Sequence, residues 1–285
     1  MAALIEPALA GQALLDDVAG AHPAGGQVAI WWLGQSGYLI KAPGALICVD
    51  PYLSEHLTRK YEGTEKPHVR MTRAPLRGAE LRGVQWVFSS HRHSDHLDPE
   101  TLPALLDANP RARLVLPLAS AEHAARLGIA QGRLVTTSGD ETLALGGLTV
   151  HVIPSAHPEF ERDAAAGYPF VGFIFELNGV TLYHSGDTLA YAGLAERLRP
   201  HSVDIAFLPI NGHPEHLRQL GVPPNMDADE ALALAAASDV RLVIPAHYDM
   251  FTFNTADVGA FSRKAEAAGQ QYRVLRCGER FSWTA

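Results

Sequence analysis

A cluster of histidine and aspartate side chains directly follows an apolar run, and this cluster limits what the chain can fold into. Residues 85–90 predict a short buried strand, which is followed at once by four ligand-type side chains: His91, His93, Asp95 and His96. In an extended segment residues i and i+2 point the same way, so His91 and His93 can hold one metal ion together. Asp95 and His96 lie in the following turn and can face a second ion, at the roughly 3.5–4 Å spacing of two-metal hydrolytic sites. The alternative is a polar surface turn, but unpaired imidazoles and a carboxylate gain little from burial at a strand end.

Four further residues of ligand type also stand where an apolar strand is expected to stop. They are Asp50 after the run 46–49, His157 after 149–154, Asp187 after 180–183 and His247 after 242–244. Strand ends are where rigid scaffolds present catalytic groups. The chain contains 14 histidines, but their positions after strands, more than their number, indicate which of them bind metal.

The hydrophobic pattern elsewhere predicts an antiparallel meander in the first half of the chain and a β-α-β unit in the second. The meander comprises 28–33, 38–41 and 46–49, and the β-α-β unit comprises 203–208, 227–237 and 241–245. Further strands are expected at 114–116, 133–136, 142–145, 148–153, 170–177, 180–184, 272–275 and 280–283, and helices at 5–20, 99–108, 119–127, 190–198 and 256–268. Asp98 is the expected N-cap of the helix at 99–108. This mixture predicts an α/β layered architecture, with residues 1–285 as a single domain.

A polar, irregular stretch at 54–82 interrupts the strands. It carries seven basic residues, which are Arg59, Lys60, Lys66, Arg70, Arg73, Arg77 and Arg82, against four glutamates. A connection of this length is either a functional lid or a mobile loop. If the substrate carries a phosphate, these basic residues are candidates to meet it.

Composition excludes several classes of protein. The formal net charge of −8 argues against a nucleic-acid partner bound by bulk attraction to phosphate. The two cysteines, Cys48 and Cys277, are too few for a disulfide framework, which favours reduced thiols. The first residues lack the basic start of a signal peptide, and no apolar run reaches the roughly 18 residues of a membrane span. We expect a cytoplasmic protein without a membrane partner; a homo-oligomer stays open.

Taken in order, the ligand-type residues resemble the full pattern of the metallo-β-lactamase superfamily. The resemblance implies a metallo-β-lactamase-like αββα four-layer sandwich of the α/β class. By the same resemblance, His91, His93 and His157 hold one ion, Asp95, His96 and His247 hold the other, and Asp187 bridges them. Asp50 matches an upstream structural aspartate and is expected to orient a ligand histidine. His184 is a candidate for the same role, with a histidine packed at a strand end as the alternative.

Several short segments are similar to the L-ascorbate-6-phosphate lactonase branch of that superfamily. They are residues 32–37, 50–53, 208–212, 225–227 and 247–251. The branch implies hydrolysis of a lactone or ester of a small, in some cases phosphorylated, sugar acid. The cofactors expected are two divalent ions, Zn²⁺ or Mn²⁺, with Fe²⁺ also suited to such ligands.

The residues also predict a mechanism. A metal-bound hydroxide would attack the carbonyl carbon or the phosphorus, and Asp95 is the expected general base because it can both bind metal and accept a proton. His213 is a candidate donor to the leaving alkoxide, with an exposed loop histidine as the alternative. Substrate contacts are assigned to polar residues beside the matched segments: Asn211, Asn225, Tyr248 and Asn254. A structural role is the alternative for each of them.

Two competing functions remain open from the sequence. A phosphodiesterase or nuclease can use the same pair of metal ions, although the acidic net charge opposes it. The other competing function is a non-catalytic protein in which metal only stabilises the fold. The complete ligand set argues against it.

Overall fold

The computed structural model describes residues 4–285, whose strands form two mixed β-sheets. Neighbouring strands of the seven-stranded sheet are, in order, β13 (Arg280–Thr284), β1 (Gln27–Gly34), β2 (Gly37–Ala42), β3 (Ala45–Val49), β4 (Trp86–Phe88), β5 (Arg113–Pro117) and β6 (Leu134–Thr137). The six-stranded sheet runs β12 (Leu242–Ala246), β11 (Ile205–Pro209), β10 (Val180–His184), β9 (Val171–Leu177), β8 (Leu148–Pro154) and β7 (Glu141–Leu145). In each sheet an antiparallel half adjoins a parallel half.

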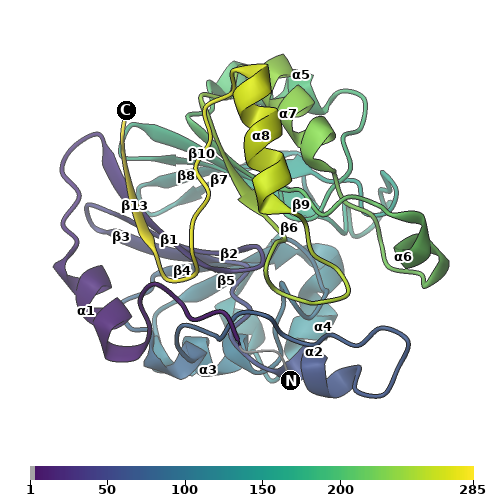
Figure 1. Ribbon diagram of the computed structural model, residues 1–285. Coiled ribbons are helices and arrows are strands. Elements are labelled where there is room, and N and C mark those ends of the chain that lie inside the picture. Colours follow the sequence, from purple (N-terminus) through teal and green to yellow (C-terminus); the bar gives the residue numbers. More distant parts are fainter. Residues whose placement is uncertain (1–3) are drawn as a thin grey trace.

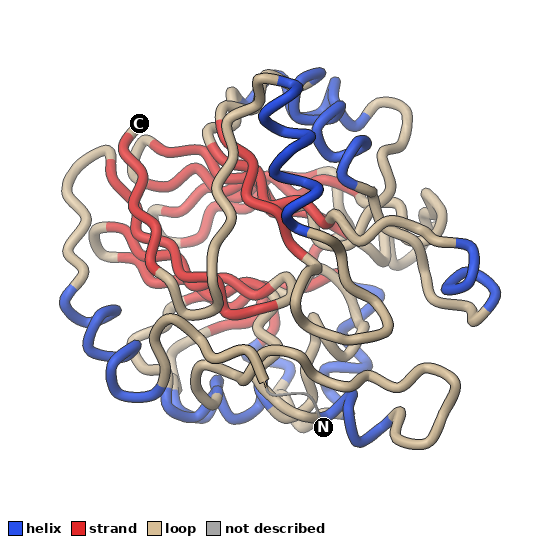
Figure 2. Tube along the Cα trace, viewed as in Figure 1, coloured by secondary structure: helices blue, strands red, loops and turns tan. Residues whose placement is uncertain are grey.

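Helices cover the outer face of each sheet, and the strands lie between them (Figures 1 and 2). The seven-stranded sheet packs against α1 (Gly11–Gly20), α3 (Thr101–Ala108) and α4 (Ala121–Arg126). The six-stranded sheet packs against α5 (Leu194–Leu198), α7 (Ala228–Ala237) and α8 (Val258–Ala268). The result is the αββα four-layer sandwich that the sequence predicted.

Strand β1 illustrates why the sequence forms these layers. Side chains alternate across a strand, and Val28, Ile30 and Trp32 point into the apolar core between the two sheets. The intervening residues, Ala29, Trp31 and Leu33, pack under the outer helices. Both faces are therefore buried, which explains the continuous apolar run in place of an apolar–polar alternation.

The expected meander and β-α-β unit are both confirmed. Strands β1, β2 and β3 pair antiparallel in sequence order. Strands β11 and β12 pair in parallel with α7 between them. Two short helices, α2 (His56–Lys60) and α6 (Glu215–Gln219), lie where no helix was expected. No helix of residues 4–285 combines the length and the apolar character that crossing a bilayer requires.

Three local predictions were wrong. The helix expected at 5–20 begins only at Gly11, because Ile5 and Ala8 donate backbone hydrogen bonds to Met71 and Cys277 of distant segments. The helix expected at 99–108 begins at Thr101 with Glu100 as its N-cap. Asp98 instead accepts hydrogen bonds in the turn before that helix. Residues 272–275 form no strand, since their segment makes an isolated bridge to β12 only through Tyr272.

Candidate metal centre

The ligand-type residues meet because the strands before them end at one edge of the sandwich. Strands β3 and β4 are parallel in the first sheet, and β8, β10 and β12 share one direction in the second. Their C-terminal loops carry Asp50 (β3), 91–96 (β4), His157 (β8), Asp187 (β10) and His247 (β12). The backbone N–H of Val171 donates to the carbonyl of Ser90 at 3.1 Å, which joins the two sheets at this edge.

The first group of converging ligands contains His91, His93, His157 and Asp187. One ligand atom from each lies within 4.8 Å of the others. His91 Nε2 is 2.8 Å from His93 Nδ1, and His157 Nε2 is 3.6 Å from Asp187 Oδ2. Ligand atoms around one divalent ion are about 3–4 Å apart, so small side-chain shifts would close this group on an ion.

The second group contains Asp95, His96 and His247. Asp187 lies against this group too, because its Oδ1 is 2.6 Å from His247 Nε2 and 3.2 Å from His96 Nε2. The two oxygens of Asp187 therefore face different groups. This geometry matches the bridging position expected for that carboxylate.

Hydrogen bonds behind the rings hold the free nitrogens toward the centre. Asp50 is fully buried, and its Oδ2 lies 2.7 Å from His96 Nδ1 and accepts from Ser90 Oγ at 2.6 Å. Ser90 Oγ is in turn 3.0 Å from His91 Nδ1, while His157 Nδ1 donates to the carbonyl of Pro224 at 2.9 Å. Such contacts select the tautomer that leaves Nε2 free to bind metal.

His184 supports the turn that carries Asp187. Its Nε2–H donates to the carbonyl of Ser36 at 2.8 Å, and its Nδ1 accepts from the backbone N–H of Gly186 at 3.1 Å. His184 lies 4.0 Å from Asp50. It therefore braces the backbone of the Asp187 loop and does not itself orient a ligand ring.

Gln35 is a buried residue of the site to which the sequence interpretation assigned no role. It lies in the turn between β1 and β2 with φ of 53°, in the left-handed region. Its amide nitrogen donates to Asp95 Oδ2 at 2.9 Å and lies 3.2 Å from His247 Nδ1. Gln35 therefore connects two members of the second group. The resemblance carried by residues 32–37 is the signal that could have found it.

Burial keeps three of the histidines neutral. Desolvation lowers the pKa of His91 and of His93 below the ordinary histidine value, and it lowers the pKa of His157 to about 4. A neutral imidazole is the form that binds a metal ion. These three side chains are therefore available as ligands at neutral pH.

The pKa values of His96 and Asp187 shift in other ways, because each of these groups lies beside groups of opposite charge. Burial alone would lower the pKa of His96, but Asp187, Asp50 and Asp95 together raise it well above the ordinary value. Burial alone would raise the pKa of Asp187, but the potential of His247 and His96 lowers it well below its usual range. Metal-free, the centre thus concentrates negative charge next to imidazoles, which is the charge distribution that attracts a cation.

Three buried atoms support the fit of this site to metal. His96 Nε2, His247 Nε2 and Asp187 Oδ1 form no hydrogen bond with any described residue, although they approach one another closely. Buried polar atoms nearly always have a hydrogen-bond partner. These three atoms point toward one another but form no hydrogen bond, and a cation bound between them would satisfy all three. The donor set of imidazoles and carboxylates suits Zn²⁺, Mn²⁺ or Fe²⁺.

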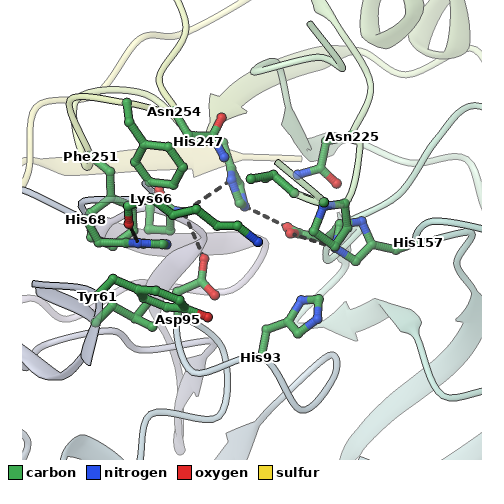
Figure 3. Close-up of a pocket in the computed structure, with 17 residues that line it drawn as sticks. Tyr61, Lys66, His68, His93, Asp95, His157, Asn225, His247, Phe251 and Asn254 are labelled. Carbon is green, nitrogen blue, oxygen red and sulfur yellow. Dashed lines mark hydrogen bonds and ion pairs between the residues drawn. The ribbon is translucent and has the colours of Figure 1, made fainter. Parts of the chain in front are cut away.

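A pocket opens over the two groups (Figure 3). Five of the expected ligands line it: His93, Asp95, His157, Asp187 and His247. The segment 54–82 contributes Leu57, Tyr61, Lys66 and His68 to its wall. The sequence left this segment open as a lid or a mobile loop and did not predict which of its side chains line the pocket, because a polar loop has no periodicity that shows which side chains face inward.

The residues expected to contact substrate divide into two sets. Asn225 and Asn254 line the pocket, and Asn211 connects them through side-chain hydrogen bonds of 3.2 and 3.0 Å. Tyr248 lies in the core instead, where its ring stacks on Trp32 and its hydroxyl donates to a backbone carbonyl. His213 does not line the pocket either; its side chain is 42% exposed and lies 3.8 Å from Glu230.

The four layers and the paired ligand groups together define a metal-dependent hydrolase of the αββα class. A family model described as a beta-lactamase superfamily domain matches residues 46–248, which is more than two thirds of the chain. The chain belongs to this superfamily, as the resemblance indicated.

Individual relatives are distant. A probable L-ascorbate-6-phosphate lactonase, UlaG, of Escherichia coli O127:H6 is 24% identical over 280 residues, covering 87% of this chain and 77% of the relative. Isothiocyanate hydrolase from Delia radicum gut bacteria has a TM-score of 0.72 at 19% identity, covering 90% of this chain and 100% of that one. Igni18, a metallo hydrolase of Ignicoccus hospitalis, has a TM-score of 0.67 at 21% identity, covering 91% and 99%. At such identities the solved structures establish the fold alone.

Proposed function

We propose that this protein opens a lactone or ester of a small sugar acid, using two divalent metal ions held by the two groups. The position of Asp187 carries the proposal, because its oxygens face His157 on one side and His96 and His247 on the other. A carboxylate with its two oxygens facing two ligand groups can hold two ions at hydrolytic spacing. The likeness to UlaG, at low identity, supports the lactone as the substrate class.

The proposed ligands are His91, His93 and His157 for one ion and Asp95, His96 and His247 for the other. When bound, the ions would supply an activated water and a Lewis acid for the acceptor oxygen. Their identity is proposed as Zn²⁺ or Mn²⁺, with Fe²⁺ as the further candidate.

The protein's own groups would perform the proton transfers and the positioning. Asp95 is proposed to accept the proton of the attacking water and to return it to the leaving alkoxide, and Gln35 holds its carboxylate by the 2.9 Å hydrogen bond. Asn225 and Asn254 also line the pocket and are proposed to offer amide groups to the substrate hydroxyls. Asn225 Oδ1 is buried and has no hydrogen-bond partner among residues 4–285.

Substrate screening of the metal-loaded protein tests this function. The panel contains hexonolactones with and without a phosphate, and bis-aryl phosphodiesters. We expect turnover of lactones that falls by about 100-fold or more in Asp95→Asn, since general-base catalysis contributes 10²–10⁴-fold. Efficient phosphodiester turnover with inert lactones would instead establish the phosphodiesterase alternative.

A further inference from the structure

One cation reaches into the pocket from the segment 54–82. The side chain of Lys66 extends across the opening in Figure 3, and its ammonium group points toward the space between Asp95 and His157. Lys66 Nζ has no hydrogen bond or ion pair with any residue in the described range 4–285. The residue Lys66 is half-buried, and a charge that is partly shielded from water is stabilised by an opposite charge.

The other basic residues of the segment are already engaged. Arg59 pairs with Glu100, Arg73 with Glu6, Arg77 with Glu80, and Arg82 with the carbonyl of Ala79. Arg70 is buried and donates to three backbone carbonyls. Lys60 lies over the ring of Tyr61, 5.3 Å from its centre. Of the seven cations that the sequence offered, Lys66 alone lines the pocket.

The backbone that carries Lys66 is held in place by its neighbours. His68 Nδ1 donates to the carbonyl of Lys66 at 2.7 Å, and the His68 ring stacks on Tyr61 and packs on Phe253 with centroid distances of 4.3 and 4.4 Å. Burial lowers the pKa of His68, so the ring stays neutral near pH 7. Two backbone hydrogen bonds tie the following residues to the loop after β12, from Met71 to Met250 and from Thr252 to Val69. A side chain on such a docked segment loses less freedom when it binds.

We propose that Lys66 binds an anionic group of the substrate, a phosphate or a carboxylate, in the pocket that the candidate metal ligands also line. This inference rests on the proposed function, whose metal ions are expected at those ligands. Lysine is a strong phosphate ligand as a compact point charge. Phe251 and Phe253 line the same pocket, and apolar walls strengthen the attraction between opposite charges.

Calorimetric binding to the metal-loaded protein tests the proposal without turnover. Four ligands of one carbon length serve as probes: glucitol, glucitol 6-phosphate, gluconate and 6-phosphogluconate. The variants are Lys66→Met, which keeps an unbranched side chain one atom shorter and removes the charge, and Lys66→Arg, which keeps the charge. Lys60→Met is the matched control, because Lys60 belongs to the same segment but does not line the pocket.

We expect Lys66→Met to weaken one class of anionic ligand by about 10–100-fold, with glucitol, the metal content and Lys60→Met unchanged. A loss confined to the two phosphate esters assigns the site to phosphate, and a loss confined to the two carboxylates assigns it to carboxylate. Lys66→Arg should retain most of the affinity.

Equal affinities of wild type and Lys66→Met for all four ligands would overturn the proposal, as would a wild type that binds none of them. These outcomes are separate from the fate of the proposed function. A protein without lactone turnover would refute that function while the binding data still report on Lys66. Conversely, normal lactone turnover with no effect of Lys66→Met on binding would refute only the anionic site.

Discussion

Replacing Asp50 by asparagine should weaken the metal centre from behind, without touching a ligand. The carboxylate is fully buried, and its Oδ1 accepts from the backbone N–H of Ser90 at 2.7 Å. Its Oδ2 serves both His96 Nδ1, at 2.7 Å, and Ser90 Oγ, at 2.6 Å. Asparagine has the same shape and tolerates the left-handed φ of 43° at this position, so the backbone does not oppose the change.

The magnitude follows from the two contacts at Oδ2. Asparagine places an N–H₂ group at one of the two oxygens and removes the charge that orients His96. Loss of a carboxylate behind a ligand histidine typically costs 10–100-fold in metal affinity, which corresponds to about 1.4–2.7 kcal/mol. The same substitution should also lower the free energy of unfolding, by about 1.5–3 kcal/mol for each charged hydrogen bond lost.

Asp98 provides a matched control for the effect on stability. It is also fully buried, and its carboxylate accepts from Ser54, Glu100 and Thr101 away from the pocket. Asp98→Asn should therefore reduce the free energy of unfolding to a similar extent while leaving metal affinity unchanged. Competition with a chromophoric chelator measures the affinity, and urea unfolding measures the stability. Wild-type affinity in Asp50→Asn, or equal losses of affinity in the two variants, would refute the reasoning.

Three further predictions concern the ions, the histidines and the packing beside the site. Elemental analysis should find two ions per chain in His201→Ala. This variant disrupts the group His151–Glu176–His201, which lies outside the pocket and could hold an extra ion; one ion or none would contradict the paired site. The metal-free protein should lose stability as pH falls from about 6.5 toward 4, because the lowered pKa of His157, about 4, means that the unfolded chain takes up the proton first. Protonation of His157 alone accounts for about 3 kcal/mol of the unfolding free energy lost between these two pH values. In His157→Gln, urea unfolding should therefore show a loss smaller by about that amount. A loss equal to that of the wild type would count against the explanation. Gly186→Ala should lower the free energy of unfolding by about 2–4 kcal/mol, because its Cβ would lie 2.6 Å from Ser90 Cβ at a φ of +59°. Gly44→Ala, with φ +73° and open space around its Cβ, should cost only about 1–2 kcal/mol, and similar values for the two would show that packing at Gly186 is not the cause.

Much of the fold could be predicted from the sequence because its signals are local. Apolar runs bounded by glycine and proline located the strands, and the β-α-β unit was predicted from the change between the two periodicities. Helix boundaries were less predictable. Asp98 has the chemistry of an N-cap, but Ser54 and Thr101 bind its carboxylate from a distant segment and from inside the helix, and such partners are not visible in a local pattern.

The candidate ligands were also predictable, since each follows a strand and strands end where scaffolds present their functional groups. The sequence by itself therefore determined which residues lie together at one edge of the sandwich. They are His91, His93, Asp95, His96, His157, Asp187 and His247. Their order along the chain also sufficed to identify the superfamily.

Only the tertiary structure decided how that set is arranged and what surrounds it. The two oxygens of Asp187 face different groups because one sheet brings β4 and the other brings β8, β10 and β12 to the same edge. Tyr248 turns into the core, Gln35 turns toward Asp95, and Lys66 alone of seven cations enters the pocket. The physical reason is that a loop side chain takes its direction from packing against residues far away in the sequence, and no local periodicity records that packing.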